Sequence, residues 1–137
     1  MEAPGKGAGY VTFVAEPVAV AAGHPSSLEM RFHIRPGYHI NSHTPKSEFL
    51  IPTKLSIDAN RDFVLSPINY PKGVEFAFSF DPTEKLDVYA SDFTLSTKIT
   101  AKAGYHTLRG TLHYQACNNA ACFPPKSLPI EILVHGT

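Results

Sequence analysis

The chain has 137 residues, and its 12 Lys or Arg residues balance its 12 Asp or Glu residues, so the formal charge at pH 7 is zero. Nucleic-acid binding is not expected, because no net positive charge attracts phosphates. No apolar run reaches the roughly 18 residues of a membrane span, so this chain is not expected to insert into a bilayer. Its length predicts one domain, at residues 10–137, after a flexible remnant at residues 1–9. We expect this domain to be a monomer.

Apolar residues with a period of two recur along the chain. Residues 10–20 form one such stretch, and because Pro17 interrupts it we expect an edge strand there. In residues 28–35, Leu, Met, Phe and Ile alternate with Glu, Arg, His and Arg. This alternation is typical of a strand with one face in the core and one in water, so His33 is predicted to be a surface residue.

The segment at residues 38–45 is polar and aromatic, and it holds His39 and His43. Pro and Gly on both sides disfavour a helix, and on an extended strand residues four apart are separated by about 13 Å, too far for one ion to bridge. An ordinary surface role and a position beside the cysteines both stay open for these histidines. A metal site is the least favoured of the three roles.

Further strands are expected at residues 53–57 and 63–68, joined by a hairpin-like polar turn, and at residues 88–89, 93–99, 108–116 and 128–134. Residues 74–82 contain three phenylalanines, which fit either a core strand or an aromatic lid. Seven to nine short strands with turn signals between them predict an all-β sandwich.

Both cysteines lie in the run YQACNNAACFPP at residues 114–125. The Asn-Asn pair between them is a turn signal, because Asn tolerates left-handed backbone angles. We therefore expect a hairpin with Cys117 and Cys122 on opposite sides of its loop, where Cα atoms about 4.5 to 5.5 Å apart permit a disulfide. Alternation along residues 108–117 predicts that Cys117 lies on the polar face, where a partner could reach it.

A disulfide that closes so short a loop stabilises a fold by only about 2 kcal/mol, which favours a redox role over a structural one. Two alternatives stay open. One is a non-catalytic binding domain whose hairpin disulfide only shapes a loop. The other is a Cys/His module that handles copper or zinc, although the second Cys or His pair of a zinc site is missing. No cofactor motif is present in the sequence, so no cofactor is expected and electrons would have to come from another protein.

The cysteine run resembles the active-site hairpin of the periplasmic N-terminal domains of the thiol:disulfide interchange protein DsbD. Two other segments, RPGYHIN at residues 35–41 and PKGV at residues 71–74, are also similar, and the likeness spans roughly residues 27–134. It implies an immunoglobulin-like sandwich, a periplasmic location and a protein-disulfide reductase component that relays reducing equivalents to thioredoxin-like partners through mixed disulfides. The start MEAPGKG has no apolar signal region, so we expect that an export signal has been removed and that Met1 is an added start.

The resemblance also implies roles for individual residues. Cys122 would be the attacking sulfur and Cys117 the resolving one. Phe80, with Phe78 second, would belong to a cap loop that shields the cysteines until a partner displaces it. The remaining residues expected to flank the site are His39, Asn41, Tyr114, Phe123 and Pro124.

Overall fold

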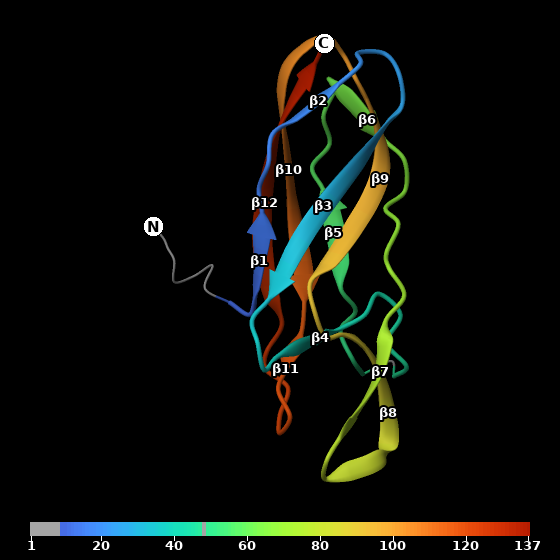
Figure 1. Ribbon diagram of the computed structural model, residues 1–137, viewed down its shortest axis with the longest axis vertical. Coiled ribbons are helices and arrows are strands. Elements are labelled where there is room, and N and C mark those ends of the chain that lie inside the picture. The colour runs from blue at the N-terminus through green and yellow to red at the C-terminus, as the bar shows by residue number, and fades with distance from the viewer. Residues whose placement is uncertain (1–8, 48) are drawn as a thin grey trace.

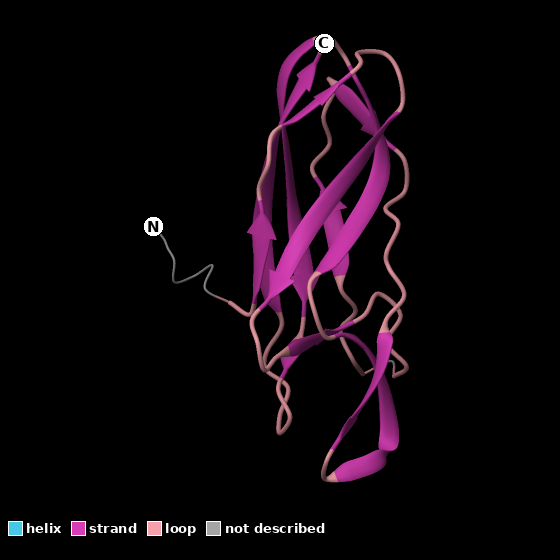
Figure 2. Cartoon of the chain, in the orientation of Figure 1, coloured by secondary structure: helices cyan, strands magenta, loops and turns pink. Residues whose placement is uncertain are grey.

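The computed structural model describes residues 9–47 and 49–137, and all the regular structure in this part of the chain is β (Figure 2). The strands are β1 Val11–Val14, β2 Val18–Val20, β3 Ser26–Ile34, β4 His39–Asn41, β5 Lys54–Ile57, β6 Phe63–Leu65, β7 Val74–Phe78, β8 Asp81–Tyr89, β9 Phe93–Ala101, β10 Gly104–Tyr114, β11 Ala116–Cys117 and β12 Lys126–Gly136. None of the described segments is a helix that is long and apolar enough to cross a membrane. The all-β prediction is confirmed, with more strands than the seven to nine expected.

Two four-stranded sheets form a sandwich around one core (Figure 1). Sheet A has the strand order β1-β3-β9-β6, and sheet B has the order β2-β12-β10-β5. The predicted alternation is visible in β3, where Leu28, Met30 and Phe32 are at most 1% exposed while the residues between them face solvent. On the facing side of the core, Leu108 and Leu112 of β10 in sheet B are fully buried. Burying each such side chain contributes about 1.5 to 3 kcal/mol, so these inner faces hold the sheets together.

The sequence predicts one edge strand at residues 10–20, whereas the structure has two edge strands separated by Pro17. β1 pairs with β3 at the edge of sheet A, and β2 pairs with β12 at the edge of sheet B. The chain therefore changes sheets at the proline, whose nitrogen has no hydrogen to donate to a ladder.

The predicted hairpin between residues 53–57 and 63–68 is wrong. β5 pairs with β10 in sheet B, whereas β6 pairs with β9 in sheet A. The polar turn between them crosses from one sheet to the other, with the Asp58 backbone N–H bonded to the carbonyl of Arg109 and the Asp62 carbonyl to the N–H of Lys102. A local turn signal shows where a strand ends, but the strand's pairing partner depends on which sheet edge is free.

A third sheet, sheet C, lies at one end of the sandwich with the order β11-β4-β8-β7. Its strands β7 and β8 form a hairpin that projects beyond the sandwich, drawn in yellow-green in Figure 1. Val74 and Phe80 in this hairpin are 55% and 68% exposed, and its other phenylalanines are only half-buried. Residues 74–82 are therefore not a core strand, and the lid-like alternative fits their position better.

Candidate functional site

The two cysteines form a disulfide across the mouth of a short hairpin, with Cα atoms 3.9 Å apart. Cys117 and Cys122 are also an isolated antiparallel bridge pair, which confirms the predicted hairpin. The backbone N–H of Asn118 donates to the carbonyl of Ala121 at 2.9 Å, and its side-chain oxygen accepts bonds from the N–H groups of Ala120 and Ala121.

The physical reason predicted for this turn is wrong, because Asn118 and Asn119 do not have positive φ angles. The side chain of Asn118 makes the turn instead, by bonding backbone groups two and three residues further on.

The two sulfurs have very different surroundings, because Cys117 is fully buried while Cys122 is exposed. Ala116 and its register partner Ile40 belong to the sandwich core, so Cys117 points to the opposite, outer face of sheet C, as alternation predicts. The prediction that this face leaves Cys117 accessible is wrong. The outer face carries its own buried side chains, including Val88 at 0% exposure.

His39 lies directly opposite Cys117 in the pairing of β4 with β11. Its side chain is only 4% exposed, so it is not an ordinary surface residue, and the strand register places it beside Cys117. The His39 ring packs against Phe76 of β7, with ring centroids 4.0 Å apart. Burial lowers the pKa of His39, and its Nε2 atom has no hydrogen-bond partner among the described residues.

His43 lies apart from this group. Its ring stacks on Tyr70 at 3.6 Å, and its Nδ1 is 2.9 Å from the carbonyl oxygen of Thr53. Within residues 9–47 and 49–137, no three His, Cys, Asp or Glu side chains gather as metal ligands would. The metal-handling alternative therefore gains no support from the arrangement of the side chains.

Asn41 and Gln115 connect the cysteine hairpin to the rest of sheet C. Asn41 is fully buried, and its amide donates to Gln115 Oε1 at 3.1 Å and to the Ile51 carbonyl at 3.0 Å. Gln115 in turn donates to the carbonyl of Phe123 at 3.4 Å, just beyond Cys122. Gln115 was not predicted as a site residue, although its place inside the cysteine run was a signal that could have identified it.

Phe123 belongs to an aromatic group beside the exposed sulfur. Its ring lies 5.3 Å from that of Tyr10 and 6.1 Å from that of Tyr38. Arg35 and Lys126 place their cationic groups about 6 Å from the Tyr10 ring. Half-buried aromatic rings and positively charged side chains therefore lie together beside Cys122.

Tyr114 is buried beneath this aromatic group and is hydrogen-bonded to the backbone of Tyr10. It is 2% exposed, and its hydroxyl accepts a hydrogen bond from the Tyr10 backbone at 3.2 Å. Burial raises the pKa of Tyr114, so its hydroxyl stays protonated at neutral pH. Pro124, two residues after Cys122, is exposed.

The phenylalanines of the β7–β8 hairpin stack in a row that leads to His39. Phe80 stacks on Phe78 at 4.9 Å, and Phe78 meets Phe76 edge-on at 5.4 Å. Phe80 lies in the turn between β7 and β8, and Figure 1 shows this hairpin and the cysteine loop projecting from the same end of the molecule. Phe76, which the sequence reasoning did not single out, packs directly on His39, and the Phe78 ring centroid lies 6.3 Å from that of His39. Shielding by Phe80 and Phe78 stays a prediction.

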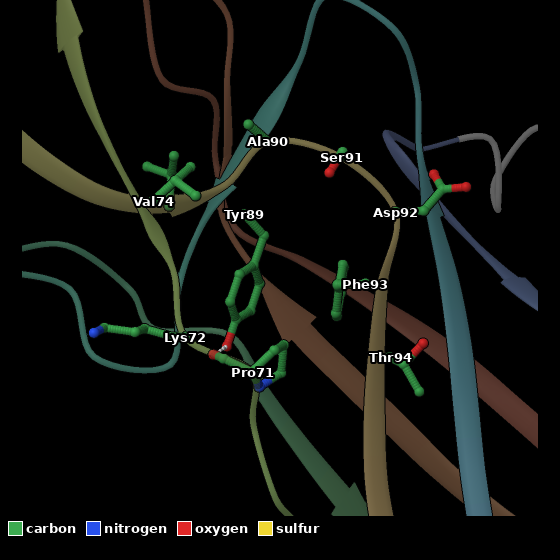
Figure 3. Close-up of a pocket in the computed structure, with 10 residues that line it drawn as sticks. Pro71, Lys72, Val74, Tyr89, Ala90, Ser91, Asp92, Phe93 and Thr94 are labelled. Carbon is green, nitrogen blue, oxygen red and sulfur yellow. Dashed lines mark hydrogen bonds between the residues drawn. The ribbon is translucent and has the colours of Figure 1, made fainter.

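The base of this hairpin encloses a pocket of about 310 Å³. Figure 3 shows the Tyr89 hydroxyl pointing at Pro71, to whose carbonyl it donates a hydrogen bond of 2.8 Å. Burial raises the pKa of Tyr89, which keeps this donor protonated. At Gly73, a Cβ atom would collide with Asp87 Oδ1, so only glycine fits. The segment that leads into β7 is thus held against β8 by this hydrogen bond and by the close packing at Gly73.

Three solved structures resemble this chain. The N-terminal domain of DsbD from Neisseria meningitidis in its reduced form is 21% identical over 84% of this chain and 82% of its own, with a TM-score of 0.54. The N-terminal periplasmic domain of ScsB from Proteus mirabilis is 14% identical over 88% of this chain, which spans only 44% of that chain, with a TM-score of 0.53. A complex between the DsbD and PilB N-terminal domains of Neisseria meningitidis matches at 18% identity over 80% of this chain and 77% of that one, with a TM-score of 0.51.

At these identities the likeness establishes the fold, an immunoglobulin-like β-sandwich. No curated protein sequence gave a significant match. The family described as "Thiol:disulfide interchange protein DsbD, N-terminal" matches residues 11–133, which is nearly the whole described domain and includes both cysteines. The chain therefore belongs to the family of N-terminal domains of the thiol:disulfide interchange protein DsbD.

Proposed function

We propose that this domain is a periplasmic relay that passes reducing equivalents between thioredoxin-like proteins through Cys117 and Cys122. Its family is one of thiol:disulfide interchange, and the periplasmic location follows from that family and from the periplasmic ScsB domain that shares the fold. The observation that carries the proposal is the asymmetric disulfide, with one sulfur exposed and one buried.

The unequal exposure supports the order proposed for the two thiols, with Cys122 attacking and Cys117 resolving. In the reduced domain, the exposed Cys122 thiolate attacks one sulfur of a partner's disulfide, and the partner's second sulfur leaves as a thiolate. Cys117 then attacks Cys122, so that the internal disulfide forms and the partner leaves with two thiols. The domain loses two electrons and the partner gains them. A dithiol donor reverses these steps and reduces the domain again.

The partner is proposed to dock on the surface beside Cys122 that Phe123, Tyr10 and Tyr38 form. A relative of this fold was solved in complex with the PilB N-terminal domain, which supports docking of another protein domain on such a module. The domain is proposed to act as a monomer. Phe80 and Phe78 are proposed to shield Cys122 until a docking partner displaces the β7–β8 hairpin.

Trapping with single-cysteine variants tests the relay. Reduced Cys117→Ser protein, mixed with oxidised thioredoxin, should accumulate a mixed disulfide because no resolving thiol remains. Cys122→Ser should form none and should fail to reduce thioredoxin. Cys117→Ser is thus the matched control, and full thioredoxin reduction by Cys122→Ser would overturn the assignment.

A redox titration separates the relay from a binding domain with a structural disulfide. A structural bond should have a potential below about −300 mV, whereas a relay should lie between about −270 and −180 mV, the range from thioredoxin to disulfide isomerase. A potential below this range would favour the binding domain.

A further inference from the structure

The outer face of sheet C holds a buried histidine directly opposite the buried sulfur. Ile40 and Ala116 face the core, so the next residues, His39 and Cys117, share the other face. Both are buried, at 4% and 0% exposure. Phe76 packs against the His39 ring, with ring centroids 4.0 Å apart. His39 and Cys117 are therefore neighbours in a small compartment that water does not reach freely.

His39 Nε2 is buried without a hydrogen-bond partner among the described residues. A buried polar atom that lacks a partner costs free energy, so its position calls for an explanation. In the disulfide state the Cys117 sulfur has no proton to offer. Reduction creates an S–H group, and directly opposed residues have Cβ atoms about 4.5 to 5.5 Å apart, a separation that an imidazole ring and a thiol can bridge. Reduction would therefore give His39 Nε2 the hydrogen-bond donor that it lacks in the disulfide state.

We propose that His39 takes the proton of the Cys117 thiol during resolution of the mixed disulfide and gives a proton to the Cys117 thiolate when the domain is reduced. This inference rests on the exchange function proposed above, and it makes His39 the general base of that reaction. Burial lowers the pKa of His39, so the ring is neutral at pH 7 and has a lone pair to accept the proton.

When Cys117 resolves the mixed disulfide, its S–H bond breaks and the proton moves to His39. The Cys117 thiolate attacks the Cys122 sulfur, forming the Cys117–Cys122 bond and breaking the bond from Cys122 to the partner. The partner sulfur leaves with the electron pair and takes up a proton, either from the imidazolium or from water. Reduction by a dithiol donor runs the same transfers in reverse.

Of the groups around His39, Cys117 is the one placed to exchange a proton with it. The charged or titratable groups on the elements packed around it are His43 and Lys46 after β4, Glu75 on β7, Asp81, Glu84, Lys85, Asp87 and Tyr89 on β8, and Cys117 with Cys122. Glu75 and Asp87 are register partners, and alternation from Phe76 places them on the opposite face of sheet C. Glu84 and Lys85 are exposed.

Stopped-flow oxidation of the reduced domain by 5,5′-dithiobis(2-nitrobenzoate) tests the proposal. Cys122 should release the first coloured thiolate at a rate that depends on reagent concentration. Attack by Cys117 should release the second in a unimolecular phase. In wild type this second phase should be flat with pH above the pKa of His39 and fall below it. In His39→Phe and His39→Gln it should be about 100-fold slower at pH 7 and rise about tenfold per pH unit as the thiol ionises by itself.

His33→Phe is the matched control, because His33 is an exposed histidine on sheet A and should leave both phases unchanged. A His39→Phe second phase with the rate and pH profile of wild type would overturn the inference while leaving the relay intact. Absence of a second phase in wild type would overturn both, since the internal disulfide would not form.

A measurement on the wild type covers the case in which the His39 variants do not fold. The imidazole ¹⁵N signals of His39 should shift between oxidised and reduced protein as Nε2 gains the thiol, while those of His33 stay fixed. Unchanged His39 signals would contradict the proposal.

Discussion

Reduction of the disulfide should leave the domain folded and lower its free energy of unfolding by about 2 kcal/mol. The cysteines are 5 residues apart in sequence, and the chain-entropy model gives about 2 kcal/mol for closing so short a loop. Neither cysteine belongs to the sandwich core, and the hairpin keeps the bond from the Phe123 N–H to the Ala116 carbonyl at 2.9 Å. Because a typical domain is stable by about 5 to 15 kcal/mol, the loss is tolerable.

Urea unfolding of oxidised and reduced protein measures this difference. The midpoint should fall on reduction while the slope stays nearly constant, since the same core is exposed. A Cys117→Ser/Cys122→Ser variant serves as the control and should match the reduced protein within about 1 kcal/mol. If reduction unfolds the domain, or lowers its free energy of unfolding by more than about 4 kcal/mol, the fold depends on the disulfide. The cysteine pair would then not be independent of the sandwich core.

Three further predictions concern the surroundings of the cysteines. Stability should fall as pH drops below 6.5, the usual pKa of histidine, because the unfolded chain binds a proton that buried, neutral His39 resists. The loss attributable to this residue is at most about 1.4 kcal/mol at about pH 5.5, and urea titrations of His39→Phe, compared with wild type, should lack it. Gly73→Ala should destabilise the domain by about 1 to 3 kcal/mol, because the added Cβ would collide with Asp87. It should also speed hydrogen exchange in β7 and β8, and unchanged exchange there would contradict the tight packing around Gly73. Asn118→Ala should cost about 1 kcal/mol in urea unfolding, as two backbone N–H groups lose their acceptor, and an unaltered midpoint would count against the turn described.

The sequence by itself determined the main strands of the sandwich and the cysteine hairpin. Period-two alternation in β3 and β10 reports which side chains are buried, because successive residues in a strand point to opposite faces. The short spacing between Cys117 and Cys122 was enough to predict a disulfide across a hairpin, and Pro17 was enough to predict an edge. Each of these features depends on residues close together in the chain.

Tertiary structure alone decided what covers the outer face of sheet C. Alternation correctly turned Cys117 away from the core, but it is buried beside His39, which lies far from it in sequence and is itself packed against Phe76 of the β7–β8 hairpin. The same holds for β5 and β6, whose partners are in different sheets. Local patterns encode the direction of a side chain, whereas burial, and with it the pKa of His39 and the unequal exposure of the two sulfurs, depends on which remote segments pack against that side chain.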